Sequence, residues 1–181
     1  MRRLFWQISL TADGFVEDRN RDLTHTAQII DADFERYASA MLASIDGFVV
    51  GRRTYELFAA YWPHATGADA DRLNGMRKLV ASRSLRELTW HNAHLAGDDI
   101  VAAVRAWKRE PGRDLAVFGS PDLAATLVRH DLVDEFRFLV TPFLLGNGTP
   151  LWRGVDAPVP LRVVRSETWA SGTVATTYRR G

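Results

Sequence analysis

Residues 45–56 read Ile45-Asp46-Gly47-Phe48-Val49-Val50-Gly51-Arg52-Arg53-Thr54-Tyr55-Glu56, which predicts a buried strand, a glycine turn and the start of a helix. Gly51 would let the backbone approach a ligand closely, and the following N–H groups would point outward where the helix dipole favours an anion. Arg52 and Arg53 add positive charge in a geometry that suits phosphate. The alternative is an ordinary strand–turn–helix joint with two solvated arginines, and these residues alone do not choose between the two.

The composition predicts one soluble globular domain over residues 1–181, with 46% hydrophobic and 25% charged residues. The chain has no cysteine, which excludes disulfides, a thiol nucleophile and thiolate metal sites. A net charge of +1 provides no global field for nucleic acid. The N-terminus has no signal-peptide core, and no apolar run reaches the ~18 residues of a membrane span. We therefore expect a cytoplasmic protein without nucleic-acid or membrane partners.

Outward from residues 45–56, strands and helices are expected to alternate before a final run of strands. The expected strands are 3–10, 46–50, 76–81, 88–95, 114–118, 136–140, 161–169 and 173–179, and the expected helices begin near residues 33, 53, 98 and 120. Residues 64–75 are polar and are predicted to be a loop, and Asp13-Gly14 suits a hairpin turn. The order predicts an α/β fold with a central mixed sheet and a C-terminal antiparallel hairpin.

Two further segments could meet an anion. Gly119-Ser120-Pro121 follows an expected strand directly, with Ser120 suited to a helix N-cap and Pro121 to the first helical position. This second strand–glycine–helix joint raises the odds of a nucleotide cofactor. Ser82-Arg83-Ser84, at the end of another expected strand, is a weaker phosphate candidate.

Among the acidic residues, Asp13, Asp33 and Glu35 are candidates for donating a proton, because burial in an apolar cleft raises the pKa of a carboxylic acid. The sequence does not rank them. We expect no metal site. Of the histidines, only His91 and His94 are close in sequence, and an i, i+3 pair on a strand points to opposite faces. The remaining histidines are His25, His64 and His130.

A series of short motifs then occurs in order. They are Ser9-Leu10-x-x-Asp13-Gly14-Phe15-Val16, Gly51-Arg52-Arg53-Thr54-Tyr55-Glu56, Ser82-Arg83-Ser84-Leu85, Val117-Phe118-Gly119-Ser120-x-x-Leu123, Leu132-Val133-Asp134-Glu135 and Pro142-x-x-Leu145-Gly146-x-Gly148. Over nearly its whole length the chain resembles the dihydrofolate reductase-like superfamily. More closely, it resembles stand-alone relatives of the reductase domain of bacterial riboflavin-biosynthesis deaminase-reductases. The resemblance implies a three-layer α/β/α fold.

The resemblance also implies that the chain binds NADPH. On this resemblance, the helix start that meets the cofactor's phosphates consists of Gly51, Arg52, Arg53 and Thr54, and the segment near the adenosine ribose and its 2′-phosphate consists of Ser82 and Arg83. The joint on the pyrophosphate and nicotinamide side consists of Gly119 and Ser120. The turn beside the nicotinamide and the substrate consists of Asp13 and Gly14.

The chain departs from this pattern at Ser120, which stands where the family has a second glycine. The pterin-anchoring acid of dihydrofolate reductases would fall on Glu35 or Asp33, which remains open. The zinc-site motif of the deaminase half is absent, so the resemblance implies reduction without deamination.

The expected function is NADPH-dependent transfer of a hydride to a small polar heterocyclic or sugar-imine substrate. The closest family activity is reduction of 5-amino-6-(5-phosphoribosylamino)uracil. The alternatives are a dihydrofolate reductase and an NADPH-binding module without turnover. A homodimer is possible, because the apolar strands 136–140 and 161–164 could form its face, although they could equally be core.

Overall fold

The structure is a computed structural model, and it describes residues 1–23, 26, 29–152 and 157–181; His25 lies outside these residues. The elements in chain order are β1 (Leu4–Thr11), β2 (Phe15–Glu17), α2 (Ala32–Ser44), β3 (Ile45–Gly51), α3 (Arg52–Tyr61), η1 (Trp62–His64), α4 (Ala68–Gly75), β4 (Arg77–Ala81), β5 (Ala93–Leu95), α5 (Ile100–Arg109), β6 (Asp114–Phe118), α6 (Pro121–Arg129), β7 (Glu135–Thr141), β8 (Thr149–Pro150), β9 (Leu161–Thr168) and β10 (Val174–Arg180).

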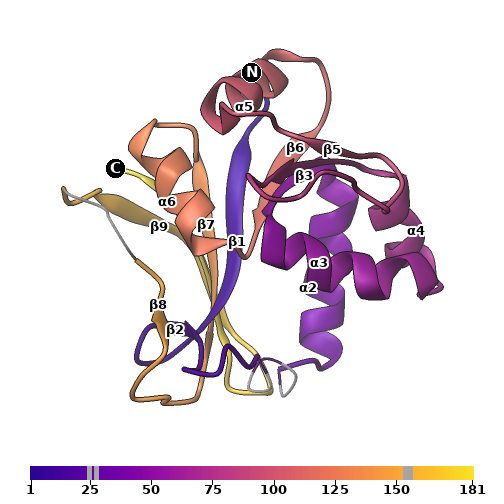
Figure 1. Cartoon of the computed structure of the whole chain (residues 1–181). Helices are drawn as coiled ribbons and strands as arrows, with labels where there is room; N and C mark the ends of the chain where they lie inside the picture. The colour runs from indigo at the N-terminus through magenta and orange to yellow at the C-terminus, as the bar shows by residue number, and fades with distance from the viewer. Residues whose placement is uncertain (24–25, 27–28, 153–156) are drawn as a thin grey trace.

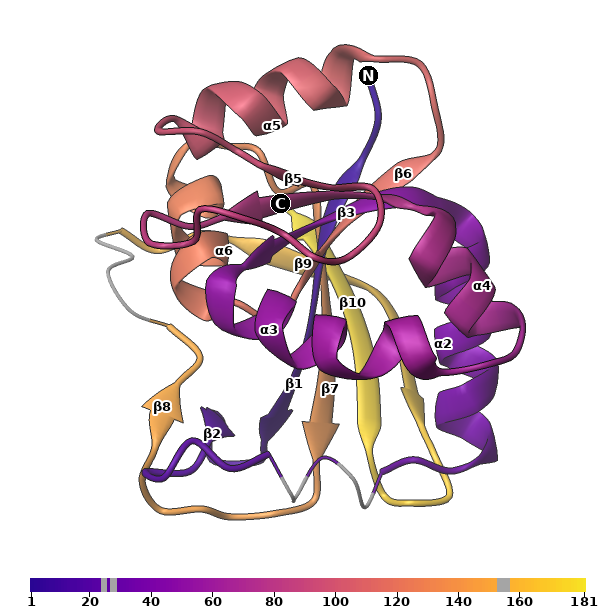
Figure 2. The ribbon, with the colours of Figure 1, turned by 45° about the vertical axis from the view of Figure 1, so that its right-hand side comes forward.

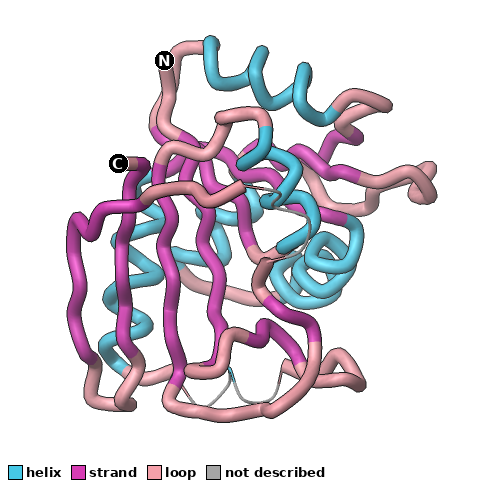
Figure 3. Tube along the Cα trace, turned by 90° about the vertical axis from the view of Figure 1, so that its left-hand side faces the viewer, coloured by secondary structure: helices cyan, strands magenta, loops and turns pink. Residues whose placement is uncertain are grey.

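Eight strands form one sheet in the order β5-β4-β3-β6-β1-β7-β10-β9 (Figure 1). Neighbouring strands from β5 to β7 run parallel, whereas β10 is antiparallel to both β7 and β9. The β9–β10 hairpin lies beside the C-terminus, where its two strands run side by side in Figure 3. The predicted α/β class, with a mixed sheet and a C-terminal antiparallel hairpin, is therefore confirmed.

Helices cover both faces of this sheet (Figure 2). Alternate strand residues enter different cores: Val49 and Val117 pack with α5 and α6, while Phe48 and Phe118 pack with α2, α3 and α4. The chain moves along the sheet in one direction from β1 through β3 to β4, and in the other from β5 through β6 to β7. Because crossovers between parallel strands are right-handed, reversing this direction moves the connecting helices to the opposite face.

Two predicted segments are wrong. The expected loop 64–75 contains α4, whose Ala70 and Leu73 are buried. Only two such residues in eight are too few for the sequence to show helical periodicity. The expected strand 88–95 is reduced to β5, because the preceding residues wrap around Tyr55. The Tyr55 hydroxyl accepts hydrogen bonds from the backbone N–H groups of Thr89 and Trp90, at 2.9 and 3.1 Å.

The turn at Asp13-Gly14 exists, but it does not make a hairpin. The Gly14 N–H donates to the Thr11 carbonyl at 2.9 Å, and Gly14 has a φ of +85°. The strand that follows, β2, pairs with β8 in a separate two-stranded sheet rather than with β1.

The apolar strands considered for a homodimer face have different environments. Phe136 and Phe138 of β7 are buried in the core, so this strand offers no apolar face for a partner. In β9, by contrast, Val163 and Val164 are exposed at the end of the sheet.

Lys78 is the most unusual buried residue of the sheet. Its side chain is fully buried, and its ammonium group donates to the carbonyls of Asn74, Met76 and His91 at 3.0, 2.7 and 3.0 Å. The ammonium also lies 4.3 Å from the ring centroid of Trp90. Lys78 therefore ties the end of α4 to the segment before β5.

We expect Gly47→Ala to lower the free energy of unfolding by about 1–3 kcal/mol, the usual cost of overpacking. A Cβ at Gly47 would lie 2.7 Å from Cη2 of Trp107 and 2.9 Å from the Arg77 carbonyl oxygen. Gly75→Ala is the matched control, because a Cβ there meets nothing within 4 Å. Urea denaturation of both variants tests this, and equal stabilities would contradict it.

Burial lowers the pKa of Lys78 from 10.5 to about 8. Between these two values the unfolded chain binds more protons at this residue than the folded chain, so Lys78 makes the free energy of unfolding rise with pH. Lys78→Met lacks this contribution. We therefore expect the stability of the wild type relative to Lys78→Met to increase from pH 7 to pH 10 in urea denaturation. A constant difference between the two proteins would show that Lys78 keeps its ordinary pKa.

Candidate functional site

The carboxyl ends of β3 and β6 lie next to each other, and the chain leaves them on opposite faces of the sheet (Figure 1). From β3 it enters α3, and from β6 it enters α6. Ligands of open α/β sheets bind outside the carboxyl ends of the strands at such a switch point. The two glycine joints predicted from the sequence, Gly51 and Gly119, therefore meet at the place where the topology favours a ligand.

One hydroxyl joins the two helix starts. Ser120 Oγ accepts a hydrogen bond from the Gly51 N–H at 2.9 Å and lies 2.9 Å from Thr54 Oγ1. Glycine keeps this approach close: a Cβ on Gly51 would lie 3.3 Å from Ser120 Oγ, and a Cβ on Gly119 would lie 3.2 Å from Thr54 Oγ1. The joints at β3 and β6 thus form one packed unit.

Ser120 is the N-cap residue of α6 and Pro121 follows it at the start of the helix, as predicted, but the serine side chain has another partner. Ser120 precedes α6, but its side chain makes no cap hydrogen bond to that helix. Its backbone is left-handed, with φ 52° and ψ 59°, directly after Gly119 at φ 53°. In this conformation the hydroxyl bonds to the start of α3 instead. A non-glycine residue with positive φ is strained, and such strain concentrates at functional sites.

The two arginines of α3 point to different partners. Arg52 forms an ion pair with Glu56 on its own helix, at 3.3 Å, and both side chains are about half exposed. Arg53 instead reaches Glu17 of β2 at 3.1 Å. Glu17 also accepts a hydrogen bond from Thr149 of β8 at 2.7 Å. Arg53 therefore links α3 to the small β2–β8 sheet, while Arg52 remains at the surface.

Burial alone would raise the pKa of Glu17, but hydrogen bonds from Arg53 and Thr149 bring its pKa below the ordinary value. Glu17 is therefore a carboxylate at neutral pH. It holds the guanidinium of Arg53 beside the start of α3.

The strand-end segment after β4 lies next to this joint, because Ala81 is the register partner of Gly51. Ser82 Oγ accepts hydrogen bonds from the N–H groups of Ser84 and Leu85, at 3.2 and 3.0 Å, and so shapes the turn. The side chain of Arg83 is exposed. The predicted residues Ser82 and Arg83 are thus near Gly51, with Arg83 accessible to a ligand.

Asp13 holds a loop in place. Its carboxylate accepts hydrogen bonds from Thr11 Oγ1 at 2.6 Å and from the N–H groups of Leu145 and Gly146, at 3.1 and 2.7 Å. These bonds, the one from Thr11 first, lower the pKa of Asp13. An ionised carboxylate that already accepts these bonds suits anchoring the loop after β7 better than donating a proton.

The acids near the start of α2 also have structural partners. Asp31 caps the helix through the Phe34 N–H at 2.8 Å. Asp33 accepts a hydrogen bond from the Ala170 N–H, at 2.9 Å, in the β9–β10 turn, and this bond, with one from Arg36, lowers its pKa. Glu35 is exposed. The structure therefore places none of the candidate acids Asp13, Asp33 and Glu35 in an apolar environment.

Three residues that the sequence did not single out contact the Gly119 joint directly or through one neighbour. Trp6 Nε1 donates to the Gly119 carbonyl at 2.7 Å, and the Gly119 N–H donates to the Gln7 carbonyl at 3.0 Å. The Tyr37 hydroxyl bonds to Oε1 of Gln7. These contacts join positions far apart in the chain, and no local pattern marks them.

No group of three or more histidines, acids or cysteines that could hold a metal ion occurs in residues 1–23, 26, 29–152 and 157–181. Within the same part of the chain, none of the helices has the length and apolar character needed to span a bilayer.

The model of the RibD C-terminal domain matches residues 2–175. The uncharacterized protein YyaP of Bacillus subtilis is 30% identical over 182 residues, which cover 98% of this chain and 94% of that protein.

Many solved structures have a similar fold, and two of them are from bacterial proteins of different kinds. One is a putative riboflavin biosynthesis protein from Shewanella sp. PV-4, with a TM-score of 0.76, 22% identity and 99% of both chains covered. The other is dihydrofolate reductase from Enterococcus faecalis, complexed with NADP(H) and RAB-propyl. Its TM-score is 0.66 at 12% identity, with 99% of this chain and 96% of that chain covered. The expected dihydrofolate reductase-like fold is confirmed.

Two substitutions of Ser120 separate the contribution of its hydroxyl to stability from the contribution of its strained backbone. We expect Ser120→Ala to lower the free energy of unfolding by about 1–2 kcal/mol, through loss of the bonds to Gly51 and Thr54. Ser120→Gly loses the same bonds but relieves the left-handed conformation, so it should be about 1 kcal/mol more stable than Ser120→Ala. Urea denaturation measures both, and equal stabilities would show that the backbone at Ser120 is unstrained.

Proposed function

Because the chain belongs to the RibD C-terminal domain family, we propose that it is a reductase that binds NADPH where α3 and α6 begin. The family and the fold are those of reductases. The observation that carries the proposal is the meeting of the Gly51 and Gly119 joints at the switch point of the sheet. Backbone N–H groups at a helix start, with arginines beside them, suit phosphate.

The residues around this joint fit the phosphate end of NADPH. Gly51 has no side chain, and α3 has no side-chain cap, so a ligand can supply the acceptor for its first N–H groups. Arg52 and Arg83 are exposed cations near the joint, while Arg53 is held there by Glu17. Ser120 Oγ already occupies the Gly51 N–H, so we propose that the phosphates bind the N–H groups beyond it.

The nicotinamide of bound NADPH supplies the hydride and its electron pair. We propose that the chain contributes mainly by holding the acceptor atom against it, which is the role of positioning in such reactions. Asp13 would fix the loop after β7, and Gln7 and Tyr37 would fix the Gly119 joint. Hydrogen bonds lower the pKa values of Asp13 and Asp33, so these residues are ionised and water is the better source of the proton that the substrate gains. Glu35 is the candidate acid that remains as an alternative proton donor.

The proposed substrate is a small polar heterocycle or sugar imine, with reduction of 5-amino-6-(5-phosphoribosylamino)uracil as the nearest family activity. The structure favours this over a folate. Asp31 and Asp33 at the start of α2 are both bonded to backbone N–H groups of the β9–β10 turn, which leaves them less available to anchor a pterin. An NADPH-binding module without turnover is the alternative of another class. The proposed setting is the cytoplasm.

We expect Arg52→Ala combined with Arg53→Ala to weaken NADPH by about tenfold or more while weakening NADH much less, since a charge-assisted bond to the 2′-phosphate is lost. Cofactor fluorescence titrations of the single and double variants measure this and show which arginine dominates. Arg72→Ala is the control, because Arg72 pairs with Asp69 on α4.

Equal losses of affinity for NADPH and NADH, or no loss for either, would contradict the proposal that Arg52 and Arg53 bind the 2′-phosphate. Turnover is tested separately by NADPH oxidation with 5-amino-6-(5-phosphoribosylamino)uracil and dihydrofolate. NADPH binding without oxidation by either compound would favour the binding module, and oxidation by dihydrofolate alone would favour the folate reductase.

A further inference from the structure

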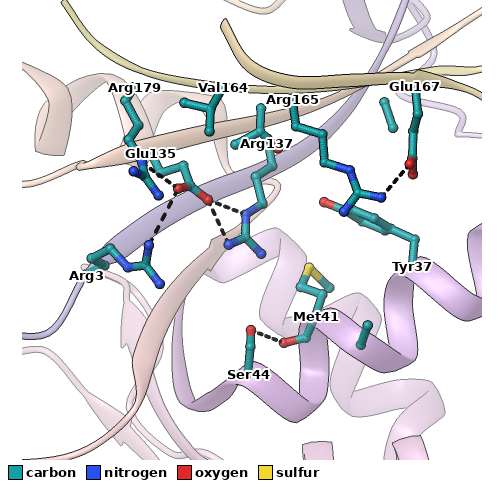
Figure 4. Close-up of a pocket in the computed structure, with 13 residues that line it drawn as sticks. Arg3, Tyr37, Met41, Ser44, Glu135, Arg137, Val164, Arg165, Glu167 and Arg179 are labelled. Atoms are coloured by element: carbon teal, nitrogen blue, oxygen red, sulfur yellow. Dashed lines mark hydrogen bonds and ion pairs between the residues drawn. The ribbon is translucent and has the colours of Figure 1, made fainter.

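A cavity of about 320 Å³ lies between α2 and the strands β7, β10 and β9 (Figure 4). Its strand side includes Glu135 and Arg137, the first and third residues of β7, and its helix side includes Tyr37 and Met41. The cavity lies at the amino end of β7, whereas the proposed NADPH site lies at the carboxyl ends of β3 and β6. It therefore belongs to a different part of the sheet.

The cavity exists because α2 packs loosely on this side. Leu42 is the only residue of the 13-residue helix that is buried. Tyr37 and Met41 are partly buried, and Ser44 at the end of the helix is exposed. Across the gap, Val164 and Arg165 of the edge strand β9 are exposed as well. A ligand could therefore enter from solvent between the helix and the hairpin.

A single buried carboxylate on the strand side is shared by three guanidinium groups. Glu135 Oε1 accepts a hydrogen bond from Arg137 Nε at 2.7 Å and forms an ion pair with Arg137 Nη2 at 2.7 Å, and Glu135 Oε2 accepts a hydrogen bond from Arg179 Nε at 3.0 Å. Arg3 Nη1 lies 4.0 Å from the same Oε2. Arg137 turns two of its nitrogens toward Glu135 and also bonds to the Tyr37 hydroxyl, which leaves part of its five N–H groups for a further acceptor.

The lining carries more positive than negative charge. Four arginines and two glutamates line the cavity, a formal surplus of two positive charges. Arg165 forms an ion pair with Glu167 at 2.6 Å, and Arg3 forms one with Asp114, outside the cavity, at 2.7 Å, so one unbalanced positive charge remains around Glu135. The Arg137 side chain is only 17% exposed, and its guanidinium lies 3.6 Å from the ring centroid of Phe5. A desolvated guanidinium beside an open cavity is stabilised by an anion.

From this arrangement we infer that the cavity binds a small organic anion, a carboxylate or a phosphate monoester, through Arg137. Figure 4 shows Arg137 and Arg165 extending from the strands toward α2, with Tyr37 and Met41 below them. The anionic group bonds the N–H groups of Arg137 that Glu135 and Tyr37 leave unused, and the body of the ligand packs on Met41 and Val164. The volume is at the lower end of the range for small-molecule sites, about 300–1,000 Å³, which limits the ligand to a small molecule.

The Tyr37 hydroxyl adds a polar group that keeps its proton. Burial raises the pKa of Tyr37 to about 12, and the hydroxyl bonds to Gln7. Gln7 is also the residue whose carbonyl accepts from Gly119. The cavity and the NADPH joint thus share one neighbour, but no side chain that would bond the anion belongs to the NADPH joint.

The test uses phenyl phosphate and benzoate as probes and benzyl alcohol as the neutral analogue, with the full chain and isothermal titration calorimetry. We expect saturable binding of at least one anion, no binding of the alcohol, and about tenfold weaker binding by Arg137→Gln, the loss expected for a charge-assisted bond. Arg36→Gln is the matched control, because Arg36 is exposed on α2 and pairs with Asp33. It should bind within about twofold of the wild type, the effect of a distant screened charge.

Backbone amide NMR locates the bound probe. Shifts at Met41, Ala175 and Thr177, without shifts at Gly51 and Gly119, support the cavity. Shifts confined to Gly51 and Gly119 overturn it, as does the absence of saturable binding or equal binding by Arg137→Gln and wild type. If Arg137→Gln does not fold, Val164→Asp replaces it, since Val164 lines the cavity and is 42% exposed, and a carboxylate there repels an anion. Unchanged anion binding in Val164→Asp would then count against the proposal. A separate NADPH titration tests the proposed cofactor site, and its result does not decide whether the cavity binds an anion.

Discussion

A right-handed crossover can return the chain to a parallel sheet on one face only, and in this protein the direction of travel along the sheet reverses between β3 and β6. That constraint sends α3 and α6 to opposite faces and leaves their first turns beside each other at one edge. The glycines at the two joints permit the close approach, and the Ser120 hydroxyl fills the space that remains. The candidate site therefore follows from the topology, and individual side chains refine it.

The loops at this edge are held by charged groups with fixed partners. Asp13 fixes the loop after β7, Glu17 fixes Arg53, and Asp33 fixes the β9–β10 turn. Each of these carboxylates has its pKa lowered by the bonds it accepts, so each is a carboxylate at neutral pH. Because these three carboxylates are ionised and already bonded, they position loops and do not exchange protons. Such an arrangement is consistent with a site in which a bound cofactor supplies the chemistry.

The sequence predicted the features that depend on neighbouring residues. The strand–glycine–helix joints at Gly51 and Gly119, and the C-terminal hairpin, each show their pattern within about twenty residues or fewer. Features that depend on distant residues were missed. The orientation of Ser120 is set by Gly51 and Thr54, 69 and 66 positions away. The arginines around Glu135 come from the residue before β1, from β7 and from β10. Helix α4 was missed for another reason, because a short helix with two buried residues has little periodicity.

The sheet ends at β9, an eight-residue strand that has β10 as its partner on one side and none among the described strands on the other. Long unpaired edges are templates for the addition of foreign strands, and proteins block them with charge and proline. Here Pro160 directly precedes β9, and Arg162, Arg165 and Glu167 lie along the strand beside the exposed Val163 and Val164. A second strand docking there would have to desolvate these charges. The same residues that keep the cavity mouth polar thus also protect the protein from edge-to-edge aggregation.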